Sequence, residues 1–81
     1  MIQVTIANNL KRSTPIIDEN MTIKAAMEQA GVDYTKGITS IDGSPLQPGD
    51  LNRTFASFGY NSEEGHNRAT VLNVVKADNA A

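Results

Sequence analysis

Residues 21–31 have the sequence MTIKAAMEQAG, and this stretch decides the fold because it is the clearest helix in the chain. Its apolar residues recur with the spacing i, i+3, i+4 and i+7, which predicts one apolar stripe on a three-turn helix: Ile23, Ala26, Met27 and Ala30. Thr22 is the expected N-cap, with Asn20 as the competing candidate, and Gly31 suits the left-handed residue after the last turn. A short amphipathic helix needs a second layer that covers its apolar stripe.

Two strands are predicted before this helix. Residues 2–6 alternate apolar and polar side chains with the period of a half-buried strand. A second run follows at residues 12–18, and the two runs together predict an N-terminal hairpin. Pro15 has no N–H to donate to a neighbouring strand, so the second run is expected at a sheet edge or at a bulge.

A second hairpin and two short turns are predicted after the helix. Asp42-Gly43 is typical of a two-residue hairpin turn between a strand at residues 38–42 and a return strand near Leu46. Pro48-Gly49 then fits the central positions of a type II turn. In the next stretch, Thr54 is positioned to cap a single helical turn over residues 55–58.

The last predicted strand covers residues 69–76, and one polar residue assigns its two faces. Burying Asn73 without a partner would cost about 1–3 kcal/mol, so this side chain is expected to face solvent. The alternation of a strand then turns Val71 and Val75 to the same side. Leu72 and Val74 are expected to point toward the helix.

Taken in order, these elements predict an α+β domain over residues 1–76, in which a four- to five-stranded mixed sheet packs on one helix. The remaining residues, 77–81, have no apolar periodicity and are predicted to form a disordered tail.

The pattern resembles the ubiquitin-like β-grasp superfamily over nearly the whole chain. Residues 2–6 look like its first strand, 41–46 like its short hairpin, 54–60 like the capped turn before its last strand, and 69–76 like its central C-terminal strand. The resemblance implies the strand order 2-1-5-3-4, which places the strand with Pro15 at an edge.

One departure from the family limits the expected function. Conjugated modifiers and sulfur carriers of this superfamily end in Gly-Gly, whereas this sequence ends in Asp78-Asn79-Ala80-Ala81 and contains no Gly-Gly. The resemblance therefore implies a non-conjugating member that acts as a non-catalytic protein-interaction module. A sulfur-carrier or protein-modifier relative that acts through its C-terminus is the alternative.

The composition argues against several classes of function. The net charge is −2 and the seven basic residues are scattered, so we expect no nucleic-acid binding. The chain has no cysteine and no apolar run of membrane-spanning or signal-peptide length, which predicts a cytoplasmic protein without membrane contact. Its economy of length suggests a bacterial or phage-like protein. Weak homodimerisation through the edge strand without proline stays open.

No residue pattern points to catalysis, a metal or a cofactor. His66 is the only histidine, and it lies in a polar stretch beside Glu63 and Glu64 without a thiolate or a recognisable nucleophile. A solvated loop histidine is the favoured interpretation, so the protein is expected not to be an enzyme.

A protein-binding face is the remaining candidate site. Two valines on one face of a central strand would form a modest apolar patch on the open side of the sheet, where ubiquitin-like domains commonly bind partners. The alternative is that isolated surface valines are simply good strand formers. The candidate face comprises six residues: Gln3, Thr5, Thr39, Ile41, Val71 and Val75.

Overall fold

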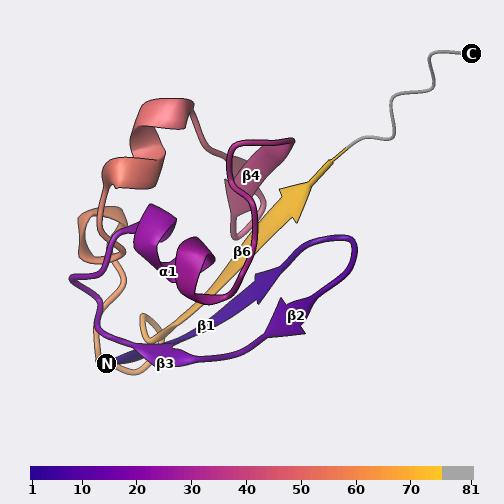
Figure 1. Cartoon of the computed structure of the whole chain (residues 1–81). Helices are drawn as coiled ribbons and strands as arrows, with labels where there is room; N and C mark the ends of the chain where they lie inside the picture. Colours follow the sequence, from indigo (N-terminus) through magenta and orange to yellow (C-terminus); the bar gives the residue numbers. More distant parts are fainter. Residues whose placement is uncertain (76–81) are drawn as a thin grey trace, which may run out of the picture.

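The computed structural model describes residues 1–75, in which one helix packs against one face of a single mixed β-sheet (Figure 1). The predicted tail, 77–81, and Lys76 lie outside the described residues. The helix is α1 (Ile23–Gln29), and two short 3-10 helices follow it, η1 (Pro48–Asn52) and η2 (Ala56–Phe58). The strands are β1 (Ile2–Ala7), β2 (Arg12–Ser13), β3 (Ile16–Ile17), β4 (Ile38–Ile41), β5 (Ser44–Pro45) and β6 (Arg68–Val74).

The sheet has the order β2-β1-β6-β4-β5, and β3 also pairs with β1. The first and last strands, β1 and β6, lie side by side and parallel in the middle, whereas the other pairs are antiparallel (Figure 1). Because β2 and β3 occupy one place beside β1, this order equals the expected 2-1-5-3-4. The α+β class is confirmed, and the arrangement is consistent with a β-grasp fold.

The N-terminal hairpin keeps one register along its whole length. Ile6 lies opposite Ser13 and Ile2 lies opposite Ile17, so the residue numbers of facing partners have the same sum at both ends. Between these pairs, the Val4 N–H donates to the carbonyl of Pro15 over 3.0 Å. Pro15 therefore lies in an edge strand without a bulge, and its missing N–H is what separates β2 from β3.

The helix is capped as its sequence predicts. The Thr22 hydroxyl accepts a hydrogen bond of 3.1 Å from the Ala25 N–H, so Thr22 and not Asn20 is the N-cap. Gly31 has a φ of +73°, the left-handed conformation expected after the last turn.

The turns of the second half confirm two predictions and correct a third. Both Asp42 and Gly43 have positive φ, as a primed hairpin turn requires. The Thr54 hydroxyl caps η2 by accepting from the Ser57 N–H over 3.1 Å. The predicted type II turn at Pro48-Gly49 is wrong, because these residues begin η1 and Gly49 does not have positive φ.

The core lies between the helix and the inner face of the sheet. Phe55 and the inward side chains of β1, Ile2, Val4 and Ile6, are fully buried in a cluster with Ile23 and Met27 of α1. Among the residues that the structure describes, every buried side-chain nitrogen and oxygen has a hydrogen-bond partner. The core is therefore closed around few polar groups, as a small domain requires.

The facing predicted for the last strand is wrong. Val71 is fully buried, and so is Asn73, at 2% exposure, whereas Leu72 and Val74 are 39% and 49% exposed. The Asn73 amide donates to the carbonyl of Lys36 over 2.9 Å and to the Thr39 hydroxyl over 3.1 Å. Because the core supplies these partners, burying Asn73 does not incur the penalty of an unpaired amide.

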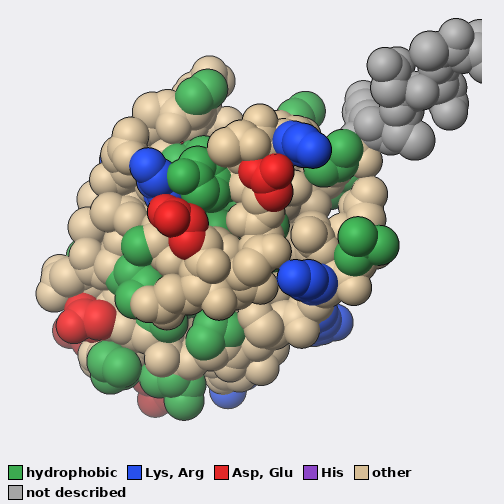
Figure 2. Space-filling view, viewed as in Figure 1, with side chains coloured by type: hydrophobic (Ala, Val, Ile, Leu, Met, Phe, Trp, Pro, Cys, Tyr) green, Lys and Arg blue, Asp and Glu red, His purple; other side chains and the backbone are tan. Residues whose placement is uncertain are grey.

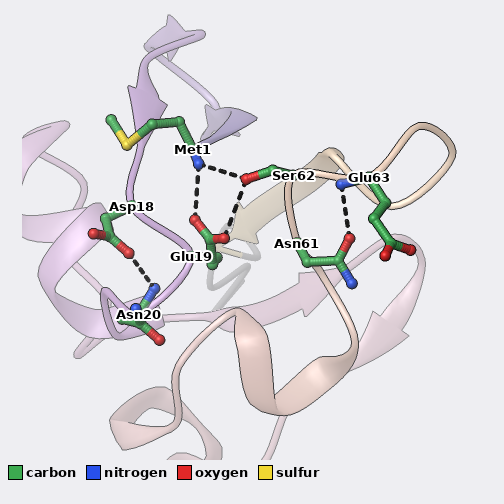
Figure 3. A network of polar contacts seen from close by, with 7 residues as sticks. All are labelled: Met1, Asp18, Glu19, Asn20, Asn61, Ser62 and Glu63. Atoms are coloured by element: carbon green, nitrogen blue, oxygen red, sulfur yellow. Dashed lines mark hydrogen bonds and ion pairs between the residues drawn. The ribbon is translucent and has the colours of Figure 1, made fainter.

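A polar network ties the start of β1 to two distant segments (Figure 3). The Met1 ammonium lies 2.9 Å from a carboxylate oxygen of Glu19 and 2.9 Å from the Ser62 hydroxyl. The ammonium holds the pKa of Glu19 below its ordinary value, chiefly through this hydrogen bond. The network joins β1, the segment before α1 and the loop before β6.

Candidate functional site

The face of the sheet opposite the helix, called the open face here, is lined by alternate residues of every strand. The alternation follows from the burial of Ile2, Val4 and Ile6 on the helix side. The registers of the neighbouring strands then give the members of the open face: Gln3, Thr5, Ala7, Arg12, Ile16, Ile38, Ser40, Pro45, Arg68, Thr70, Leu72 and Val74.

Exposed apolar side chains gather at one end of the open face. Ile38 lies directly opposite Val74, and Leu72 lies between Ala7 and Ser40 on the neighbouring strands. Ile38, Leu72 and Val74 are 57%, 39% and 49% exposed, and we call these three residues the apolar patch. Facing side chains on adjacent strands have Cβ atoms about 4.5–5.5 Å apart, so Ile38 and Val74 adjoin, and Leu72 is the next residue of β6 on the same face.

Only part of the predicted binding face lies on the open face. Gln3 and Thr5 do lie there. Three residues of the prediction lie on the helix side and are buried, so the prediction that they are exposed is wrong: Thr39, Ile41 and Val71. Val75 is 41% exposed but follows the end of β6, where its carbonyl accepts from the side-chain amide of Asn9 over 3.1 Å.

The apolar patch was not predicted from the sequence, because the last strand was assigned the opposite facing. A signal was available in the polar pair Thr39 and Asn73. These two residues face each other on neighbouring antiparallel strands. Two polar side chains at facing positions can satisfy one another inside a core, which makes their burial feasible.

The charges of the open face have one sign. Arg12 and Arg68 are its charged members, and the strand positions of this face that the structure describes include no Asp or Glu. A different side of the molecule, seen in Figure 2, has acidic and basic side chains scattered among apolar ones. The open face is therefore a mixed surface in which an apolar patch is accompanied by two basic and several uncharged polar residues.

A side-chain clasp holds the hairpin of β4 and β5 against β6. The Tyr60 hydroxyl donates to Asp42, whose other carboxylate oxygen accepts from the Thr70 N–H over 2.9 Å. Burial and the neighbouring carboxylate raise the pKa of Tyr60 well above its ordinary value. Tyr60 therefore stays a neutral donor, and its ring packs edge-on against Phe55 with the centroids 6.4 Å apart.

A hollow of about 440 Å³ lies beside the apolar patch, between the start of β4 and η1. Its apolar lining comes from Tyr34, Ile38, Leu46, Pro48 and Leu51. Ile38 belongs to both features, so the hollow extends the apolar patch around the edge of β4.

His66 lies in a tight turn. Its N–H donates to the carbonyl of Glu63 over 2.9 Å, and its side chain is exposed. Within residues 1–75, no group of three or more His, Cys, Asp or Glu side chains is placed to hold a metal ion. The described part of the chain also includes no helix that is long and apolar enough to cross a membrane.

No protein-family model matches the sequence, and no curated protein matches it. The candidate site therefore rests on the geometry of the open face.

Proposed function

We propose that this protein is a ubiquitin-like, non-catalytic interaction module that binds a protein partner through the open face of its sheet. The observation that supports the proposal is the apolar patch, Ile38, Leu72 and Val74, which two adjacent strands expose together. Contiguous apolar side chains on a surface are typical of sites where proteins associate. The cytoplasmic location and the bacterial or phage-like origin remain predictions.

The charged residues of the open face add to the chemistry of the partner. Arg12 faces Ala7, the neighbour of Leu72, and Arg68 begins β6, so the complementary surface combines apolar side chains at the patch with carboxylates farther out on the open face. The apolar contacts supply most of the affinity, and the arginines favour the correct orientation and speed the encounter.

The polar groups of the chain have structural roles that agree with a non-catalytic module. Tyr60 donates to Asp42 in the clasp, and Asn73 donates within the core. His66 is an exposed turn residue without a neighbouring nucleophile in its turn. These groups therefore support the hairpin, the core and a turn.

The test compares two variants that place acids at exposed apolar positions. Leu72→Asp combined with Val74→Asp puts two charges in the patch, whereas Leu10→Asp puts one on an apolar residue that is 90% exposed in the first hairpin turn, off the open face. Each tagged protein is used to capture partners from a lysate of the source cells, and captured proteins are mapped by cross-linking and mass spectrometry.

We expect the unmodified protein and Leu10→Asp to capture the same partner, which cross-links near β4 and β6. The double variant should bind this partner at least about tenfold more weakly, a loss of roughly 1.4 kcal/mol in binding free energy. Arg68→Glu should lower the affinity for this partner, and the loss should grow as the salt concentration decreases. Equal capture by the double variant, with its fold intact by circular dichroism, would overturn the proposal.

A further inference from the structure

The two edges of the sheet differ in the backbone groups that they present. We call the edge formed by β5 the far edge. There the backbone carbonyl of Thr39 accepts from the Leu46 N–H over 2.8 Å, so Leu46 directs its backbone groups toward β4, and by alternation Ser44 does the same. Pro45, between them, is the β5 residue whose backbone points outward, and it has no N–H. The far edge therefore offers no donor from β5 to another strand, which corrects the expectation that this edge lacks proline.

The near edge, residues 12–17, is different. The hydrogen bonds to β1 are made by alternate residues, since Asn8 donates to the carbonyl of Lys11 and Val4 donates to that of Pro15. Ser13 and Ile17 have the same inward alternation. The residues between them direct their N–H and C=O groups away from the sheet: Arg12, Thr14 and Ile16.

Pro15 does not protect this edge. Its ring nitrogen lies at an inward position, opposite Val4, so the missing N–H is lost from the contact with β1. Within the described residues, the six outward groups of Arg12, Thr14 and Ile16 enter no hydrogen bond. The near edge therefore presents three donors and three acceptors at strand spacing, a template for another strand.

The charges along this edge favour a second copy of the same edge. Lys11 and Arg12 lie at its start, and Asp18 and Glu19 follow it. If two copies pair antiparallel about Thr14, Arg12 lies opposite Ile16 of the second copy and diagonal to its Asp18. Diagonal neighbours are about 7–8 Å apart, within reach of an arginine side chain. Parallel pairing would instead place like charges together.

We infer that the protein forms a twofold-symmetric dimer by antiparallel pairing of residues 12–16 with the same residues of a second copy. Thr14 pairs with Thr14 at the symmetry axis, and the three outward residues of each copy exchange backbone hydrogen bonds. Threonines at facing positions are a favourable cross-strand pair. The open faces of both copies then become one continuous surface.

The dimer closes the assembly. Pairing consumes the near edge of each copy and leaves the two β5 edges at the ends of the joined sheet. Each end presents Pro45, which has no N–H to donate. A third copy therefore finds no complementary edge, and the assembly stops at two.

The test uses Thr14→Pro, with Thr14→Val as the matched control. The proline removes the outward N–H at the axis and leaves the bonds to β1 in place, whereas valine removes only the hydroxyl. Sedimentation equilibrium up to millimolar protein measures the association, and amide chemical shifts report the fold of each monomer. We expect the unmodified protein and Thr14→Val to dimerise and Thr14→Pro to associate at least about tenfold more weakly, since both axial hydrogen bonds are lost.

A charge swap tests the direction of pairing independently of any backbone change. Arg12→Glu should weaken the dimer, adding Asp18→Lys to it should restore the association, and high salt should reduce the difference. Leu72→Asp, on the apolar patch, should leave the dimer intact. A monomer at millimolar concentration or an undiminished dimer of Thr14→Pro would overturn the inference without touching the proposed function. Loss of the dimer in Leu72→Asp would overturn it by placing self-association on the apolar patch.

Discussion

Asn73 is a polar residue buried on the inner face of β6, and its surroundings explain why it is tolerated. Its amide donates to a backbone carbonyl and to the Thr39 hydroxyl, and both acceptors are provided by the segment that begins β4. The interaction therefore fixes the position of β4 on β6 as well as satisfying the amide. A hydrogen-bonded polar pair in a core specifies one register, which an apolar pair does not.

The pairing of Asn73 with Thr39 is testable by a double-mutant cycle. Asn73→Ala should lower the free energy of unfolding by about 1–3 kcal/mol, because it removes the amide and leaves acceptors unpaired in the core. Thr39→Val and the double variant complete the cycle, measured by urea unfolding. The double variant should cost less than the sum of the two single changes, whereas simple additivity would contradict a direct interaction. Ser40→Ala, on the open face, should change stability by less than about 0.5 kcal/mol.

Gly37 is required both by its positive φ and by its close approach to Val74, and Gly43 serves as a control that has the positive φ alone. Both have positive φ, at +71° and +86°, but a Cβ on Gly37 would collide with the carbonyl oxygen of Val74, whereas one on Gly43 would meet no atom within 4 Å. Gly43→Ala should therefore cost about 1–2 kcal/mol from backbone strain alone. Gly37→Ala should cost about 1–3 kcal/mol beyond that, because strands β4 and β6 must also separate. Equal losses in thermal unfolding would rule out the collision.

At the scale of elements, the last strand shows what alternation alone can and cannot determine. Both of its faces include apolar residues, so the period of two identified a strand without identifying its inner side. The inner side is set by the partners that β4 provides for Asn73, which is a long-range property. The helix stripe, the Asp42-Gly43 turn and the Thr54 cap were predictable because each depends on residues close together in sequence.

The same limit explains the outcome for the candidate site. Gln3 and Thr5 were placed correctly because the alternation of apolar and polar residues within β1 decides which way their side chains face. The apolar patch depends on how β4 and β6 are turned relative to each other, and no local pattern contains that relation. A site formed across strands is therefore less predictable than the strands themselves.

Acidic substitutions at two neighbouring positions of β6 test its facing directly. Val71→Asp should destabilise the fold by about 3 kcal/mol or more, because it buries an unpaired charge. Leu72→Asp should cost less than about 1 kcal/mol, because that side chain is 39% exposed. Chemical unfolding of both variants measures the difference, and the reverse order of stability would show that the strand is turned the other way.

At the scale of the whole molecule, a polar network at the N-terminus joins parts of the chain that are far apart in sequence. The Met1 ammonium, Glu19 and Ser62 bring the start of β1, the entry to α1 and the loop before β6 together (Figure 3). The residues of this network are far apart in sequence, so it forms only in the folded chain. The stability that this network contributes should consequently depend on pH, because its charges do.

The ion pair of Glu19 should make stability depend on acid. Because the folded pKa of Glu19 lies below its ordinary value of 4.5, the stabilisation is present above that pH and is lost as the pH falls through the folded pKa. Unfolding of the unmodified protein and of Glu19→Gln, followed from about pH 7 to pH 2.5, should therefore differ at neutral pH and converge in acid. A difference that persists in acid would contradict the ion pair.

Glu64→Gln is the matched control for this measurement. Glu64 is exposed and enters no ion pair among the residues that the structure describes. Its stability profile should follow that of the unmodified protein over the same range of pH.

The parallel pairing of β1 with β6 also governs the order of events during biosynthesis. The strand at the middle of the sheet is synthesised after every other described element, so the nascent chain has no central partner for β1 or β4 until residues 68–74 have emerged. Until then, the apolar side of β1 and the stripe of α1 are accessible to chaperones. Folding therefore follows translation of β6, and a message truncated before residue 68 yields a product without a closed core.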